Sequence, residues 1–143
     1  MRDTDVAYLA GLIDGEGTIS CSITKTSRGF LALHKQLSIF NTNISLISWI
    51  TNRFGGVVHS RKRKEEWKQE HQVKWSAEDA VTILGLVLPY LVIKSEQAEI
   101  FIALHNTKSI QGVSLETQVY RQKLVDRLQE LNKRGEKTAG CLA

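Results

Sequence analysis

The chain has 143 residues, of which 42% are hydrophobic and 24% are charged, as is typical of one folded domain with its own core. No apolar run is long enough to span a membrane, and the acidic segment Met1–Asp5 is unlike a signal peptide. Cys21 and Cys141 lack redox or metal-binding spacing, and the four histidines lack zinc-ligand spacing. We therefore expect free thiols in an intracellular, reducing compartment, either the cytoplasm or an organelle matrix.

The net charge is +4, but it is unevenly distributed along the chain. Between Thr18 and Trp75, Lys and Arg outnumber Asp and Glu by seven, whereas the rest of the chain carries a net charge of −3. A solvated basic surface would explain this excess. The concentration of the excess in one stretch favours instead a face that binds a polyanion.

The first half of the chain predicts a helix, two strands and a second helix. Asp3 or Thr4 can cap a helix that ends at about Asp14. Residues 18–24 alternate polar and apolar side chains, a pattern typical of a half-buried strand, and residues 26–29 form a hairpin tip. A second strand follows over residues 31–40. Next comes a helix that starts after a capping Asn43 and ends at the glycine pair 55–56.

The second half repeats this plan. We expect a strand from Val57 into the basic run 61–64, a turn at 65–66, and a returning strand through Val73 and Trp75. Ser76 caps a helix over residues 77–88, which Pro89 ends. Further helices are expected over residues 95–106 and 115–134, the last with Leu124, Leu128 and Leu131 on one face.

The predicted fold class is α+β, with the order αββαββα followed by C-terminal helices. Four antiparallel strands form one saddle-shaped sheet per subunit, with the helices on one face and the other face open, polar and basic. We expect one domain over residues 1–134 and a flexible tail over residues 135–143.

The most informative segment is Leu9–Gly17, which reads LAGLIDGEG. Small residues and one acid share a helical face with spacing i, i+3, i+4 and i+7, and a partner backbone could approach this face closely. These four residues are Ala7, Ala10, Gly11 and Asp14. Gly15 and Gly17 are expected to break the helix and leave Glu16 at its exit. A second copy of the helix would bring two Glu16 carboxylates together, an arrangement suited to divalent metals and phosphoryl chemistry. A well-packed helix with an ordinary end explains the same residues.

This segment resembles the signature of the LAGLIDADG homing endonucleases, with Gly15 in place of Ala and Glu16 in place of the second Asp. The segments 38–43 (SIFNTN) and 88–98 (LPYLVIKSEQA) resemble the second strand and a later helix junction of that family. The chain holds one copy of the motif, and in this family one copy implies a homodimer.

The resemblance implies roles for individual residues. Glu16 corresponds to the metal-binding acid, and the carbonyl oxygen of Gly15 would be a further ligand. The metal is Mg²⁺, with two or three ions per dimer, and Mn²⁺ would substitute. Lys94 corresponds to a basic residue near the scissile phosphate, although a solvated lysine after a proline turn has the same sequence. Asn41 falls where the family often has a water-positioning Gln, and an Asn turn at a strand end is an equal contender. Asp14 is expected to cap and orient the helix end.

The implied function is that of an intron-encoded, site-specific endonuclease. It would make metal-dependent double-strand breaks in a long pseudo-palindromic DNA target. Short polar side chains and arginines on the strands would contact bases, whereas lysines would mostly contact phosphates. The expected DNA-binding residues are Ser20, Ser22, Thr24, Lys25, Arg28, His34, Gln36, Ser38, Arg61, Lys62, Arg63, Lys64, Lys68, Gln72 and Lys74.

Two other functions use the same basic surface. One is an RNA-binding maturase of the same family that binds its own intron, and the other is a DNA-binding regulator with this fold that does not cleave. The acid at Glu16 and the basic Lys94 favour cleavage, and a protein with both endonuclease and maturase activity would carry the same residues.

Overall fold

The computed structural model describes residues 2–62, 64–65, 68–107 and 113–142, with side chains in the last helix described as far as Lys133. The first four elements are α1 (Asp3–Glu16), β1 (Gly17–Lys25), β2 (Leu31–Asn41) and α2 (Ile44–Phe54). They are followed by β3 (Val57–Arg61), β4 (Glu70–Trp75), α3 (Ala77–Val87), the 3₁₀ turn η1 (Leu88–Tyr90), α4 (Ser95–His105) and α5 (Leu115–Leu142). The predicted order is confirmed.

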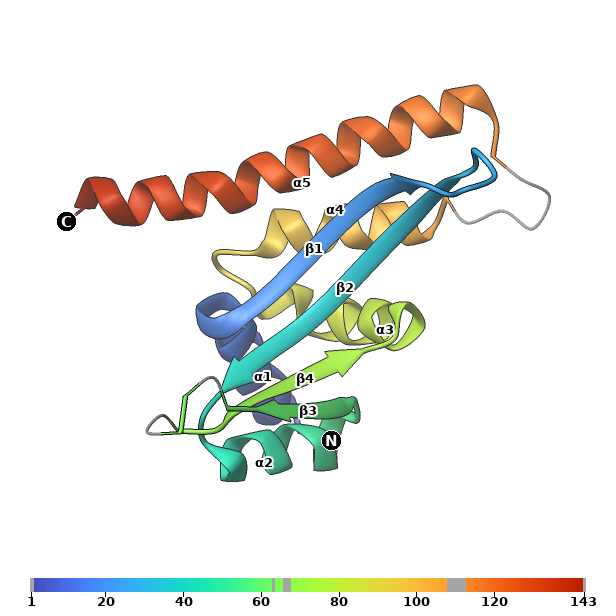
Figure 1. The fold of residues 1–143 in the computed structure, drawn as a ribbon. Helices are drawn as coiled ribbons and strands as arrows, with labels where there is room; N and C mark the ends of the chain where they lie inside the picture. Colours follow the sequence, from blue (N-terminus) through green and yellow to red (C-terminus); the bar gives the residue numbers. More distant parts are fainter. Residues whose placement is uncertain (1, 63, 66–67, 108–112, 143) are drawn as a thin grey trace.

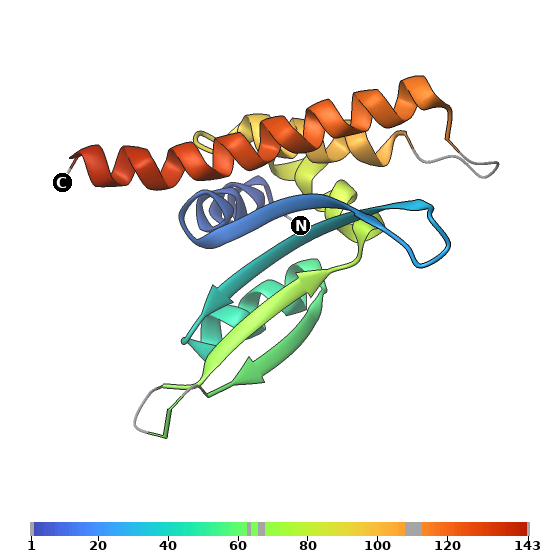
Figure 2. The same cartoon turned by 45° about the horizontal axis from the view of Figure 1, so that its top comes forward.

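The strands form one antiparallel sheet in the order β1-β2-β4-β3, so that β4 lies between β2 and β3 (Figure 1). The helices pack on one face of this sheet and extend past its β1 edge (Figures 1 and 2). The core lies between the two layers. In β4, for example, His71, Val73 and Trp75 are buried, whereas the alternate residues are only partly covered. The predicted α+β fold with helices on one face is confirmed.

Local signals fix several element boundaries as expected. The side-chain Oδ1 of Asn43 accepts a hydrogen bond from the N–H of Leu46 at 3.1 Å, which caps α2. At the other end of α2, Gly56 has φ +100°, and a Cβ there would lie 2.7 Å from Cγ1 of Val73. This position therefore requires glycine both for its backbone angle and for the close approach of β4.

Three helix limits differ from the sequence-based predictions. Helix α1 has Arg2 at its N-cap position, without the side-chain cap expected from Asp3 or Thr4. At its other end, α1 continues through Gly15 to Glu16, because the N–H of Gly17 still donates to the carbonyl of Ile13. Helix α5 continues beyond residue 134 to Leu142, through a segment with no proline to stop it.

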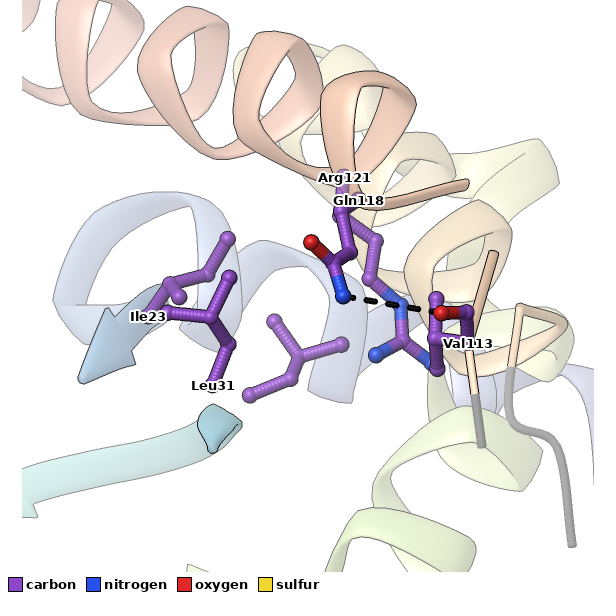
Figure 3. A pocket seen from close by; sticks show the side chains of 6 residues that line it. Ile23, Leu31, Val113, Gln118 and Arg121 are labelled. Carbon is purple, nitrogen blue, oxygen red and sulfur yellow. Dashed lines mark hydrogen bonds between the residues drawn. The ribbon is translucent and has the colours of Figure 1, made fainter. Parts of the chain in front are cut away.

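Strand β1 forms one edge of the sheet, and α5 covers this edge. Asn132 Nδ2 donates to the carbonyl of Ile19 at 3.2 Å, and Gln129 Nε2 donates to the carbonyl of Cys21 at 3.5 Å. Near the hairpin tip, a small hollow separates Ile23 and Leu31 from Gln118 and Arg121 at the start of α5 (Figure 3). Helix α5 thus satisfies edge carbonyls that would otherwise be open to another strand. In the described part of the chain, no helix combines the length and apolarity needed to cross a membrane.

Candidate active site and nucleic-acid interface

Glu16 is the last residue of α1, and its side chain is exposed. Asn41, at the end of β2, donates from Nδ2 to Oε2 of Glu16 at 2.7 Å. The other end of the same amide is also engaged, because its Oδ1 accepts from the N–H of Asn43 at 2.7 Å. Asn41 is therefore held between the start of α2 and the acid, and it fixes the orientation of the Glu16 carboxylate. A surface hollow next to this pair is lined by Glu16, Phe40, Asn41, Thr42 and Glu70.

Asp14, two residues before the end of α1, holds the segment that leads into α4. Its Oδ2 accepts from the N–H of Val92 at 2.8 Å, and its Oδ1 accepts from the N–H groups of Ile93 and Lys94 at 3.1 and 2.9 Å. Three backbone donors converge on one carboxylate at the N-terminus of a helix, where negative charge is stabilising. Asp14 was expected to cap the end of its own helix, but its carboxylate instead fixes the backbone of residues 92–94, which lead into α4.

The same interactions place Lys94 beside the end of α1. The ammonium group of Lys94 donates a hydrogen bond to the carbonyl of Gly17, the residue that follows Glu16. Burial lowers the pKa of Lys94, and the nearby charge of Asp14 acts in the opposite direction. Lys94 is therefore partly buried, with its side chain held by Gly17 and its backbone by Asp14, which argues against the alternative of a freely solvated lysine.

Glu16 and the carbonyl of Gly15 are the candidate metal ligands at the end of α1. Within the described residues, no group of three or more His, Cys, Asp or Glu side chains could hold a metal ion. Mg²⁺ is nevertheless commonly bound by one or two carboxylates and several waters, in complexes with phosphates. An exposed Glu16 with a neighbouring Gly15 carbonyl fits such a sparse site, which two copies of α1 would complete.

The open face of the sheet carries most of the residues predicted to contact DNA. On β1, Ser20 and Ser22 are partly exposed, and Thr24 shares a 2.8 Å hydrogen bond with the exposed His34 on β2. Gln36 on β2 and the β4 residues Gln72 and Lys74 are partly exposed as well. The structure thus brings together predicted residues from three strands on one surface.

The basic residues outside these strand centres are also accessible. Lys25 at the end of β1 and Arg28 in the hairpin tip are both exposed. Lys62, Lys64 and Lys68 are exposed in the connection between β3 and β4. Arg63 lies outside the described residues. Arg61 ends β3, where it pairs with Glu70.

The prediction that Ser38 contacts DNA has to be corrected. It shares the open face by alternation, but it is fully buried at 0% exposure. It lies between Thr18 on β1 and Lys74 on β4, and Gln36 Nε2 donates to its Oγ at 3.4 Å. Neighbours on both adjacent strands therefore cover the short hydroxyl, and it cannot contact a base as we expected.

Three residues on the open face were not predicted from the sequence. Phe40, His59 and Glu70 stand directly opposite or beside the predicted residues Gln72 and Arg61. The alternation that selected Ser38, Arg61 and Gln72 could have found them, because each lies two residues from one of those positions. They were missed because an aromatic residue and an acid are less typical of a DNA-binding strand than hydroxyl and basic residues.

The face of α1 predicted for dimerisation is only partly accessible. Ala7 and Gly11 are exposed, and a Cβ added at Gly11 would have no neighbour within 4 Å. Ala10 is a correction, since it is fully buried in the core of its own chain. It lies one turn from Val6 and Ile13, which point into that core. Asp14 is partly buried and bound to its own chain, so the exposed surface runs through Gly15 instead.

Comparison with known proteins agrees with this architecture. Residues 9–93 match the family described as LAGLIDADG endonuclease. The fold resembles the homing endonuclease I-CvuI, solved in complex with the I-CreI target, with a TM-score of 0.72 and 22% identity over 91% of this chain and 85% of that one. It also resembles the archaeal intron-encoded homing endonuclease I-Vdi141I, solved with DNA, with a TM-score of 0.75 and 19% identity over 92% and 86%.

A third structure, the LAGLIDADG homing endonuclease I-GzeII with its DNA target, matches with a TM-score of 0.64 and 20% identity over 84% of this chain but only 42% of its own. The family match covers more than half of the present sequence and includes the helix that ends in Glu16. The chain belongs to the LAGLIDADG endonuclease family.

Proposed function

We propose that this chain is a homing endonuclease that acts as a homodimer and makes Mg²⁺-dependent double-strand breaks in a long, pseudo-palindromic DNA target. The observation that carries the proposal is the arrangement at the end of α1. There, Glu16 is oriented by Asn41, and the ammonium group of Lys94 is anchored to the carbonyl of Gly17, the residue after Glu16. An exposed acid held near a lysine supports the proposal, because a carboxylate can bind a divalent metal and a cation can stabilise charge on the phosphate.

Glu16 would hold the metal with the Gly15 carbonyl, and Mn²⁺ would substitute for Mg²⁺ at an oxygen-rich site. When bound, the metal stabilises charge on the phosphate and lowers the pKa of water. The hydrogen bond from Asn41 limits rotation of the Glu16 carboxylate, which holds the acid ready for its ligand.

Lys94 would act on the phosphate rather than on the acid. Its ammonium group is fixed at the end of α1 by the Gly17 carbonyl and through the contacts of Asp14 with its backbone. From there a positive charge would stabilise the negative charge that grows on the phosphate oxygens during cleavage.

A second copy of the chain would complete the site through α1. The exposed residues Ala7, Gly11 and Gly15 leave room for a close helix contact. Val92 and Ile93, which are 84% and 68% exposed and hydrogen-bonded through their N–H groups to Asp14, extend this surface with apolar side chains. One copy of the fold covers 42% of I-GzeII, so two copies approach the length of that DNA-binding chain. A two-fold axis along α1 would assign one Glu16 to each DNA strand.

The open face of the sheet would bind the DNA. Exposed lysines at both ends of the strands would contact phosphates and make binding salt-dependent, whereas polar side chains on the strands would contact base edges. Two such sheets related by a two-fold axis would span about 20 base pairs, with half-sites in inverted order.

The experiment compares purified wild-type protein with Glu16→Gln on DNA selected for binding from a randomised library. We expect Mg²⁺-dependent cutting of both strands by the wild type, no cutting by Glu16→Gln, and equal affinity for the selected DNA. Glu99→Gln removes an exposed acid of α4 and is the matched control, with unchanged cutting expected. Binding without cutting by the wild type would instead indicate a non-catalytic regulator, and preferential binding of intron RNA would indicate a maturase.

A further inference from the structure

Arg61 and Glu70 form a cross-strand pair on the open face of the sheet. They stand directly opposite each other on β3 and β4, and Arg61 Nε donates to Oε2 of Glu70 at 3.2 Å. The Arg61 guanidinium carbon also lies 5.9 Å from the centre of the Phe40 ring on β2. Contacts from β4 and β2 therefore hold this guanidinium, although its side chain is 57% exposed.

Glu70 places a carboxylate on the surface that we propose binds DNA. Among the described residues of the four strands, Glu70 is the one acid whose side chain alternates onto the open face. A negative charge opposes the binding of phosphates, so Glu70 lowers the affinity of this surface for any DNA. We infer that the benefit which offsets this loss of affinity comes from the contact of Glu70 with Arg61. The acid engages Nε, and a guanidinium engaged in this way keeps both terminal nitrogens for a bidentate acceptor.

The pair also lies next to the candidate active site. The hollow around Arg61 is lined by Phe40, His59, Ser60, Arg61, Glu70 and Gln72. The hollow around Glu16 is lined by Glu16, Phe40, Asn41, Thr42 and Glu70. The two share Phe40 and Glu70, so a group bound by Arg61 adjoins the group bound by Glu16.

We propose that Glu70 and Phe40 position Arg61 to read a guanine close to the cleaved phosphate, which makes Glu70 a specificity-determining residue. The O6 and N7 atoms of guanine accept two parallel hydrogen bonds from an arginine, and no other base edge in the major groove offers this pair. Glu70 keeps the guanidinium in the orientation for a base edge and disfavours a phosphate in its place. The inference rests on the proposed DNA-binding function.

The test measures base preference by binding, without need for cleavage. Wild-type protein, Glu70→Gln, Arg61→Ala and the double variant are each used to select bound double-stranded DNA from a randomised library in EDTA. We expect the wild type to prefer guanine about tenfold or more at one pair of symmetric positions. Cleavage mapping in Mg²⁺ should place these positions within about half a helical turn, or about 5 base pairs, of the cut.

Glu70→Gln should reduce this preference several-fold at those positions alone, while total affinity stays equal or rises. Arg61→Ala should abolish the preference, and adding Glu70→Gln to it should change nothing further. Glu65→Gln is the matched control, because it removes an exposed acid from the connection between β3 and β4 rather than from β4 itself. It should retain the full preference.

The outcomes separate the competing explanations. A wild-type guanine preference that survives Glu70→Gln, or the absence of any such preference, overturns the inference. Loss of cleavage in Glu70→Gln with unchanged base preference also overturns it, and would make Glu70 a metal-binding acid of the Glu16 site. Selective DNA binding by a wild-type protein that never cuts would refute the proposed endonuclease function but leave the role of Glu70 intact.

Discussion

The carboxylate of Asp14 accepts a hydrogen bond from the backbone N–H of Lys94 at 2.9 Å, across 80 residues of sequence. This contact joins the helix that carries Glu16 to the segment that carries the candidate catalytic lysine. Because Asp14 also binds the N–H groups of Val92 and Ile93, the whole approach to α4 is fixed to one helical turn. The acid and the lysine are thereby held in register by a residue that need not contact the substrate.

We predict that Asp14→Ala destabilises the protein and slows cleavage more than it weakens DNA binding. Loss of a charged acceptor leaves three backbone donors unpaired, and the free energy of unfolding should fall by about 2 kcal/mol. Asp14→Asn keeps one acceptor oxygen, so its stability and cleavage rate should lie between those of the wild type and of Asp14→Ala. Urea unfolding measures the first effect, and single-turnover cleavage at saturating protein measures the second.

Asp79→Asn, which changes an exposed acid in the first turn of α3, is the control and should alter neither quantity greatly. If Asp14→Ala unfolds as the wild type does and cuts at the wild-type rate, Asp14 does not position Lys94.

Lys94→Met should slow cleavage about 100-fold while leaving affinity for the target nearly unchanged, because a charge that acts mainly on the transition state contributes little to ground-state binding. Single-turnover rates and equilibrium binding on the same DNA measure both quantities. Lys123→Met, which removes an exposed charge from α5, should cut normally. A wild-type rate for Lys94→Met would show that the anchored lysine is structural.

The sequence predicted the elements well because their signals are local. Asn43 and Ser76 cap the helices that follow them, and each does so through the backbone N–H three residues later. The end of α1 was predicted two residues too early, because a glycine can continue a helix as well as end it. Gly15 stays helical, since Glu16 and Gly17 continue the hydrogen bonding.

The site was only partly predictable, because its key contacts link distant segments. Glu16 was found through the motif that precedes it, but its bond to Asn41 depends on where β2 ends beside α1. The burial of Ser38 depends on neighbours from β1 and β4, and strand alternation within β2 carries no information about them. Likewise, Ala10 and Gly11 are adjacent small residues, and only the packing of α1 shows that one is buried and the other open.

Cys21 should be unreactive in the folded protein. Burial raises the pKa of the Cys21 thiol to about 12, with the charge of Lys35 acting in the opposite direction. In a Cys141→Ser variant at pH 8, we therefore expect a disulfide reagent to react about 10³-fold more slowly than with the urea-unfolded chain. Because the folded pKa is raised, this thiol contributes stability that is complete below its ordinary value of 9.0 and is lost as the pH rises towards 12. Rapid reaction of the folded protein at pH 8 would contradict the burial of Cys21.

Gly11→Leu should prevent dimer formation without preventing the subunit from folding. A Cβ added at this exposed position has no neighbour within 4 Å beyond its own stretch of helix, so the subunit should fold with near-normal stability. In the proposed dimer, however, the same side chain would lie between two α1 backbones and keep them apart. We expect light scattering to show a dimer for the wild type and a monomer for Gly11→Leu, with double-strand cleavage lost in the variant.

Gly85→Leu provides the matched control for this change. Gly85 is also an exposed helical glycine with no neighbour within 4 Å of an added Cβ, but it lies in α3 rather than α1. Replacing it should therefore cost no more stability than the change at Gly11, and it should leave both the dimer and the cleavage of two strands intact. A wild-type protein that stays monomeric on DNA and still cuts both strands would exclude the homodimer, as would a Gly11→Leu variant that dimerises and cuts normally.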